Sequence, residues 1–184
     1  MMRSVLLAVA CGVIPLSASS PALPAQLLPV YGGADGTAFT RSCGAGKVLT
    51  GLRFRDGLLV DAVGLLCRPV NANGTLGSET TVGTLAGGSG GTSGTVSCGT
   101  SGVVTGATIK HGSYVSFLSL KCRVWEAGSR SFSGIGATGG TFGSVGTPGA
   151  TNEEVCEART QPVTGMRGRS HSLVDAIGFI CDEP

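Results

Sequence analysis

Charged and aromatic residues are scarce in this 184-residue chain. Asp, Glu, Lys and Arg together make up 13% of the residues and aromatic residues 5%, with one tryptophan and two histidines. The formal net charge is only +2, and the positive residues are scattered along the chain. Proteins that bind nucleic acid or anionic membranes present a basic patch or run. We therefore expect neither of these partners.

Long apolar runs are also lacking, with one exception at the N-terminus. Met1–Arg3 is a short positive segment, residues 4–16 are mostly apolar, and small residues follow. This layout is typical of a secretory signal peptide (residues 1–25), cleaved between residues 18 and 25, which leaves one domain over residues 26–184. No other window approaches ~18 apolar residues, so we expect no transmembrane helix.

These features predict a secreted protein, or a periplasmic one if the source is bacterial. The segment Ala8-Val9-Ala10-Cys11 resembles a loose lipobox, which leaves a lipoprotein as an alternative.

Motifs of the common catalytic and metal-binding classes are missing. The chain has no C-x-x-C pair, no G-x-S-x-G segment and no phosphate-binding loop, and its histidines are not spaced as ligands with the cysteines. We therefore expect no metal and no cofactor. Glu153, Glu154 and Glu157 cluster, and two carboxylates can hydrolyse or transfer sugars. A glycan-processing enzyme thus stays open as the less favoured alternative to a protein without catalysis.

Glycine is abundant, with 32 residues. The glycines show no Gly-X-Y period, which excludes collagen. They lie between short runs rich in valine, threonine and serine, a pattern that predicts many turns between many short strands.

Six of the seven cysteines lie outside the signal segment, because Cys11 falls within it. They form successive pairs separated by 24, 24 and 25 residues. Six cysteines allow fifteen pairings, but the regular spacing favours closing each pair on itself. The predicted disulfides are Cys43–Cys67, Cys98–Cys122 and Cys156–Cys181. Such bonds persist in an oxidising compartment, and each contributes roughly 3–4 kcal/mol in the chain-entropy model.

The cysteine pairs belong to a threefold internal repeat with a period of about 55 residues. The copies read CGAGKVLTGLRFRDGLLVDAVGLLCR (copy one, 43–68), CGTSGVVTGATIKHGSYVSFLSLKCR (copy two, 98–123) and CEARTQPVTGMRGRSHSLVDAIGFICD (copy three, 156–182). With their lead-in segments the repeats span about 31–78, 86–130 and 139–184. Gly32-Gly33 aligns with Gly87-Gly88 in the lead-ins to copies one and two, whereas the lead-in to copy three does not align cleanly.

Each copy has the alternation of a β-hairpin. In copy one, Val63, Leu65 and Cys67 share a face, residues 48–54 form a preceding strand, and Asp56-Gly57 forms the turn. The same alternation recurs at Leu118, Leu120 and Cys122 and at Ile177, Phe179 and Cys181. Further strands are expected before each first cysteine, at 37–43, 92–98 and 151–156, and at 79–86 and 130–135.

One hairpin with few inward side chains cannot bury a core, but three sheets facing a common axis can. We therefore expect three four-stranded sheets, with the small side chains of Thr50, Thr105 and Thr164 at the crowded centre.

This repeat, together with the phrase GRSHSLVDAIGFI at residues 168–180, resembles the type I β-prism over nearly all of residues 30–184. The period and the cysteines are similar to vitelline membrane outer layer protein I, and the phrase to jacalin-related lectins. The resemblance implies an all-β fold of three four-stranded Greek-key sheets with pseudo-threefold symmetry. A β-trefoil is also threefold, but the chain lacks the Q-x-W signature of that fold.

The resemblance to the lectins implies sugar-binding loops of the form G-x-x-x-D. Copy one keeps both residues, as Gly57 and Asp61; copy two keeps Gly112 and has an aromatic Tyr114; copy three keeps only Asp175. A carboxylate accepts charge-assisted hydrogen bonds from sugar hydroxyls, and glycine lets the backbone approach a ligand. The alternative is that these segments are plain hairpin loops whose aspartates cap turns.

Other aligned or unusual residues have less specific interpretations. Arg55, Lys110 and Arg169 align across the copies and are expected on a solvent face, with a shared surface for anionic glycans as the less favoured alternative. Trp125 is expected in the core, with a sugar-stacking platform as the alternative.

Together these features predict a secreted, disulfide-stabilised protein that binds a carbohydrate or glycoconjugate without catalysis. A structural coat protein of the vitelline membrane outer layer type is the first alternative. A lysozyme-like transferase is the second.

Overall fold

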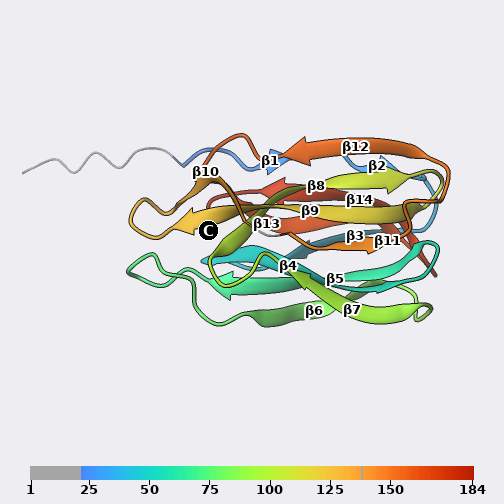
Figure 1. Ribbon diagram of the computed structural model, residues 1–184, viewed down its shortest axis with the longest axis horizontal. Coiled ribbons are helices and arrows are strands. Elements are labelled where there is room, and N and C mark those ends of the chain that lie inside the picture. Colours follow the sequence, from blue (N-terminus) through green and yellow to red (C-terminus); the bar gives the residue numbers. More distant parts are fainter. Residues whose placement is uncertain (1–21, 138) are drawn as a thin grey trace, which may run out of the picture.

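The computed structural model describes residues 22–137 and 139–184. Its secondary structure there is all β, in fourteen strands that run along the long axis of the molecule (Figure 1). The predicted signal peptide falls almost wholly outside the described residues. Within the described part, no helix has the length and hydropathy needed to cross a membrane, and no three His, Cys, Asp or Glu side chains cluster as metal ligands.

The strands form three antiparallel sheets, each built around the hairpin of one copy. Sheet I contains β4 (Lys47–Asp56), β5 (Val60–Pro69), β6 (Thr80–Gly87) and β7 (Thr92–Ser97) in the order β6-β5-β4-β7. Three consecutive strands followed by a fourth that returns beside the first make a Greek key.

Sheet II repeats this topology around the hairpin of copy two. It contains β8 (Gly102–His111), β9 (Val115–Glu126), β10 (Ser131–Ala137) and β12 (Ala150–Val155) in the order β10-β9-β8-β12, and the short β11 (Thr141–Gly143) also pairs with β9.

Sheet III joins the two ends of the described chain. It contains β13 (Val163–Ser170) and β14 (Val174–Cys181) with β3 (Thr37–Ser42) on one side and β1 (Gln26–Leu27) and β2 (Tyr31–Gly32) on the other. The expected four strands are thus right for sheet I, whereas sheets II and III each have a fifth short strand. The fold class predicted from the sequence is confirmed.

The sheets do not coincide with the repeats. The lead-in strand of copy two, β7, pairs with β4 of copy one, and the lead-in strand of copy three, β12, pairs with β8 of copy two. The lead-in strand of copy one, β3, closes the cycle by pairing with β13 of copy three. Each copy therefore completes the sheet of the copy before it.

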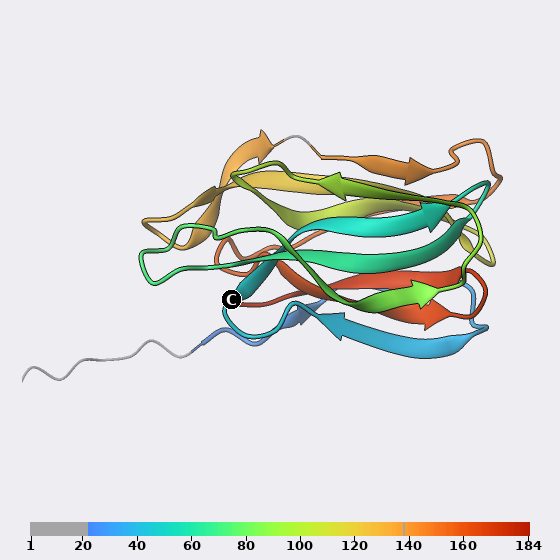
Figure 2. The same cartoon turned by 90° about the horizontal axis from the view of Figure 1, so that it is seen from below.

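The core lies between the three sheets (Figure 2), where β4, β8 and β13 contact one another. The nine residues assigned to the inward face of the second hairpin strands are all buried, as predicted. Thr50, Thr105 and Thr164 are also buried. Their carbonyl oxygens accept hydrogen bonds of 2.7–2.8 Å from the backbone N–H groups of Cys98, Cys156 and Cys43, in that order.

The three predicted disulfides are present, and each one crosses from one sheet to the next. Cys43 directly follows β3 of sheet III and bonds to Cys67 in β5 of sheet I. Cys98 follows β7 of sheet I and bonds to Cys122 in sheet II, and Cys156 follows β12 of sheet II and bonds to Cys181 in sheet III. The disulfides therefore connect the three sheets into a closed covalent ring.

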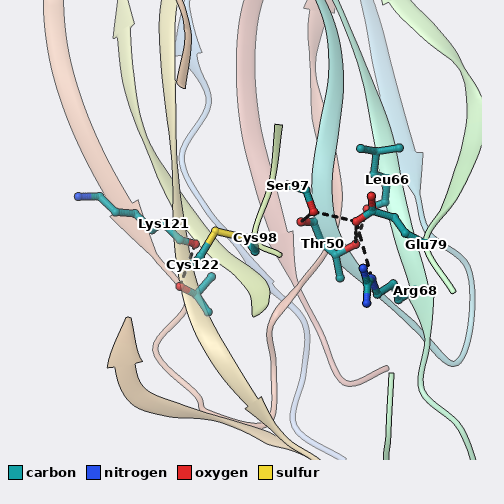
Figure 3. The surroundings of a disulfide bond; sticks show 9 residues. Thr50, Leu66, Arg68, Glu79, Ser97, Cys98, Lys121 and Cys122 are labelled. Carbon is teal, nitrogen blue, oxygen red and sulfur yellow. Dashed lines mark hydrogen bonds and ion pairs between the residues drawn. A yellow bond between two sulfur atoms is a disulfide. The ribbon is translucent and has the colours of Figure 1, made fainter. Parts of the chain in front are cut away.

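Polar contacts reinforce the end of the molecule that carries the cysteines. Beside Cys98, the Glu79 carboxylate accepts hydrogen bonds from the hydroxyls of Thr50 (2.7 Å) and Ser97 (3.0 Å), which joins β4 to β7 (Figure 3). Trp125 is buried, as expected, and its indole N–H donates to the carbonyl of Gly74 at 2.8 Å. Its place in the core makes it a packing residue.

Candidate functional site

The three hairpin turns lie together at one end of the molecule, on the right in Figures 1 and 2. The turns comprise residues 57–59, 112–114 and 171–173. Each turn is closed by the same backbone hydrogen bond, in which its first N–H donates to the carbonyl two residues later at 2.9–3.0 Å. The repeated phrase of the sequence therefore produces three equivalent loops on one surface.

A second loop lies beside each hairpin turn. We call these segments the glycine loops; they are residues 87–91 beside copy one, 143–149 beside copy two and 32–36 beside copy three. The N–H of Gly33 donates to the carbonyl of Asp175 at 2.9 Å, that of Gly88 to Asp61 at 2.9 Å, and that of Ser144 to Ser116 at 2.7 Å. Gly32-Gly33 thus serves copy three and Gly87-Gly88 serves copy one, a cyclic shift that the alignment of lead-ins does not predict.

Glycine is required where the two loops meet. Gly32, Gly87 and Gly143 have φ values of +136°, +125° and +86°. A Cβ atom on these residues would lie 2.0, 2.1 and 2.2 Å from the carbonyl oxygens of Asp175, Asp61 and Ser116. Only glycine accommodates both this backbone conformation and this close approach.

A basic side chain holds each glycine loop. The Arg55 guanidinium donates to the carbonyls of Gly90 (2.6 Å) and Gly91 (2.8 Å), and that of Arg169 to Asp35 (2.9 Å) and Gly36 (2.7 Å). Lys110 donates in the same way to the carbonyl of Val145. These aligned residues are partly exposed to solvent, and their charged groups also fix the glycine loops.

The side chain at the last position of the G-x-x-x-D motif has a different environment in each copy. Asp61 is half-buried, and Cβ atoms built on Gly90 and Gly91 would lie 2.3 and 2.5 Å from its carboxylate oxygens. Asp175 is only 2% exposed, and its Oδ2 is buried without a hydrogen-bond partner among the described residues. A Cβ on Gly36 would lie 2.4 Å from this oxygen, so the glycine loop covers the carboxylate.

Copy two lacks the carboxylate, and its Ser116 is buried and donates to the carbonyl of Lys110 at 3.3 Å.

The residues predicted to bind sugar therefore lie in the three neighbouring hairpin turns or at the start of the strand that follows each turn. Gly57 lies in the copy-one turn and Asp61 is the second residue of β5; Gly112 and Tyr114 lie in the copy-two turn, and Asp175 is the second residue of β14. Gly57 and Gly112 are exposed, and the Tyr114 side chain is 37% exposed, as expected for a loop tip.

A polar cluster next to the copy-three loop has no signal in the sequence. The ring of Tyr31, just before Gly32, stacks on His111 with centroids 5.4 Å apart, and its hydroxyl donates to Glu154. This hydrogen bond raises the pKa of the Tyr31 hydroxyl. His111 Nε2 lies 3.0 Å from Asn152 Oδ1. The cluster fastens β2 of sheet III to sheet II.

The acidic cluster considered for catalysis is divided between two faces. Glu153 and Glu154 are successive residues of β12, so their side chains point to opposite faces. Glu153 forms an ion pair of 2.7 Å with Lys121, which holds the pKa of its carboxyl below the ordinary value, whereas Glu154 accepts from Tyr31. Glu153 and Glu154 therefore do not form a pair of carboxylates flanking one substrate bond.

Three antiparallel sheets packed around a shared core are the architecture of a type I β-prism, and comparison with solved structures agrees. The chain is similar to a mannose-binding jacalin-related lectin from Ananas comosus (22% identity, 87% of this chain and 99% of that one, TM-score 0.60). It is also similar to Calystegia sepium agglutinin (18% identity, 88% of this chain and 99% of that one, TM-score 0.61). A third similar structure is Malaysian banana lectin (17% identity, 88% of this chain and 100% of that one, TM-score 0.59). At these identities the likeness shows the fold. No family model and no curated protein sequence matches the chain.

Proposed function

We propose that this protein binds carbohydrate, without catalysis, through the loops at the end opposite the disulfides. The observation that carries the proposal is the repeated unit of a hairpin loop, a glycine loop against it and a basic residue that fixes the glycine loop. Backbone groups held in this way, beside a carboxylate, suit the directed hydrogen bonds that sugar hydroxyls form. The likeness to structures of lectins, one of them a mannose-binding lectin, supports this assignment.

Copy one is the best candidate for the principal site. It is the only copy that has both the glycine and the aspartate of the G-x-x-x-D loop, and Asp61 is half-buried whereas Asp175 is almost fully covered. A sugar reaches the Asp175 carboxylate only if the glycine loop around Gly36 moves. We therefore propose copy one as the stronger site and copy three as a weaker one.

We also propose that the protein is exported. Three disulfides support this, because such bonds persist in oxidising compartments. The signal segment at residues 1–25 is consistent with the same route.

A glycan array of the mature, oxidised protein tests the proposal, with Asp61→Ala, Asp175→Ala and Ser116→Ala measured in parallel. Ser116→Ala is the matched control, because it changes the equivalent position of the copy that lacks a carboxylate. We expect selective binding that falls at least about tenfold in Asp61→Ala, the size of a lost charge-assisted hydrogen bond. Asp175→Ala should have a smaller effect.

A structural coat protein is the second candidate, favoured by the covalent ring that joins all three sheets. In that case, protein whose three disulfides are verified by mass spectrometry would show no selective binding on the array. This result would refute the carbohydrate-binding proposal.

A further inference from the structure

An apolar hollow of about 570 Å³ opens at the loop end, between sheets I and II. One wall is the tip of the copy-one hairpin and the other is the glycine loop of copy two. Its lining residues are Leu58, Leu59, Ser144, Gly146, Thr147 and Pro148. The volume falls within the range of roughly 300–1,000 Å³ typical of sites for small ligands.

At this end, each glycine loop meets the tip of a neighbouring hairpin. The other two of these junctions are closed. A Cβ on Gly33 would lie 2.3 Å from the carbonyl oxygen of Ser113, and one on Gly88 would lie 2.3 Å from that of Ser172. In both places the glycine loop rests directly on the neighbouring hairpin tip. The third junction is open because the copy-two loop is longer and contacts the tip through Thr147, whose hydroxyl donates to the carbonyl of Leu58 at 3.1 Å.

The chemistry of the open junction also differs. Leu58 is 78% exposed, whereas the other copies have serine at this position, Ser113 and Ser172. Copy two has no carboxylate with which to bind sugar hydroxyls. An exposed leucine tip at the mouth of a hollow indicates a place for an apolar group.

We propose that the hollow binds the alkyl or aromatic group of a glycoconjugate whose sugar is bound at Asp61. The proposal rests on the proposed function for the identity of the sugar-binding residue. Leu59 is the last residue of the copy-one turn and Asp61 is the second residue of β5, so their Cα atoms are at most about 7 Å apart. A single ligand can therefore contact the carboxylate through its sugar and the hollow through its aglycone.

Calorimetry with paired ligands tests this inference on the mature, oxidised protein. The probes are methyl and octyl glycosides of mannose, glucose and galactose, each below its micellar concentration. We expect the octyl glycoside of the sugar that binds to bind at least about tenfold more tightly than the methyl glycoside, because a few methylenes are buried. Leu58→Ser should abolish this preference, and the fold tolerates serine at the equivalent positions of the other two copies.

Val145→Ser is the matched control. Val145 is 65% exposed in the same glycine loop but does not line the hollow, so its loss should leave the octyl preference unchanged. Equal affinity for octyl and methyl glycosides, or an octyl preference that survives Leu58→Ser, would overturn the inference.

A sugar-free probe separates this inference from the proposed function. Saturation transfer from the methyl groups of Leu58 and Leu59 to 1-hexanol supports the hollow even if no glycoside binds, in which case only the sugar proposal fails. Absence of such transfer in the wild-type protein, together with no octyl preference, rejects the hollow as an apolar site.

Discussion

At the scale of single residues, the loop end depends on glycines that no other residue can replace. Gly87 combines a φ of +125° with a Cβ position 2.1 Å from the carbonyl oxygen of Asp61. Gly44 has a φ of +87°, but no atom lies within 4 Å of its Cβ position. The two glycines therefore separate the cost of backbone conformation from the cost of close approach.

We predict that Gly44→Ala lowers the free energy of unfolding by about 1–2 kcal/mol, the cost of a left-handed conformation. Gly87→Ala should cost at least about 1 kcal/mol more, because backbone atoms must also shift. Urea unfolding of both variants measures the difference. Equal losses would show that the glycine loop moves away without cost and is not a fixed part of the site.

At the scale of elements, β12 is tied to β9 within sheet II through the acidic side chain of Glu153. The Lys121 ammonium lowers the pKa of Glu153, so the ionised form of this carboxyl is favoured in the folded state. A group with a lowered folded pKa contributes stability above its ordinary pKa, and this contribution is lost as pH falls through the folded value.

We predict that Glu153→Gln lowers the melting temperature slightly at pH 7 and has no effect at strongly acidic pH. The difference should begin to shrink as pH falls below about 4.3, the ordinary value for glutamate. Glu157→Gln is the control, since Glu157 has no ion pair among the described residues. A difference that persists undiminished in acid would show that the ion pair is not its cause.

At the scale of the whole molecule, the disulfides act as a ring. Each joins a different pair of sheets, and the sequence separations of 24, 24 and 25 residues are nearly equal. The ring holds together three sheets that exchange their lead-in strands.

We predict that replacing any one cysteine pair by alanine lowers the free energy of unfolding by roughly 3–4 kcal/mol, because loops of equal length restrict the unfolded chain equally. Guanidinium unfolding of the three double variants makes the comparison. A pair whose loss costs nothing would show that its sheet junction is held by packing alone.

Much of this architecture is predictable from local patterns. The period-two alternation predicts the hairpins. The spacing of the cysteines predicts which cysteines bond to each other. Both patterns can be seen in the sequence because each hairpin and each cysteine pair lies within one copy. The fold follows from the need of three half-buried hairpins to share a core.

The contacts between copies are not predictable in this way. Asp61 and Asp175 both occur in a Val-Asp-Ala phrase, yet only Asp175 is sealed, by a glycine loop more than a hundred residues away in the chain. The lead-in containing Gly143 does not align with the others, and only the structure shows that it occupies the equivalent place. The sequence likewise does not show that Arg55 and Arg169 hold glycine loops, because each arginine and its partner loop are far apart in the chain.

The central claim is that the loop end binds carbohydrate, with copy one as the principal site. Amide chemical-shift mapping on isotope-labelled, oxidised protein, titrated with the glycan that binds best on the array, tests it most directly. The account predicts that the largest shifts fall at residues 57–61 and 87–91, with smaller shifts at 171–175 and none near the disulfides. Shifts confined to the cysteine end or to the outer faces of the sheets would contradict it.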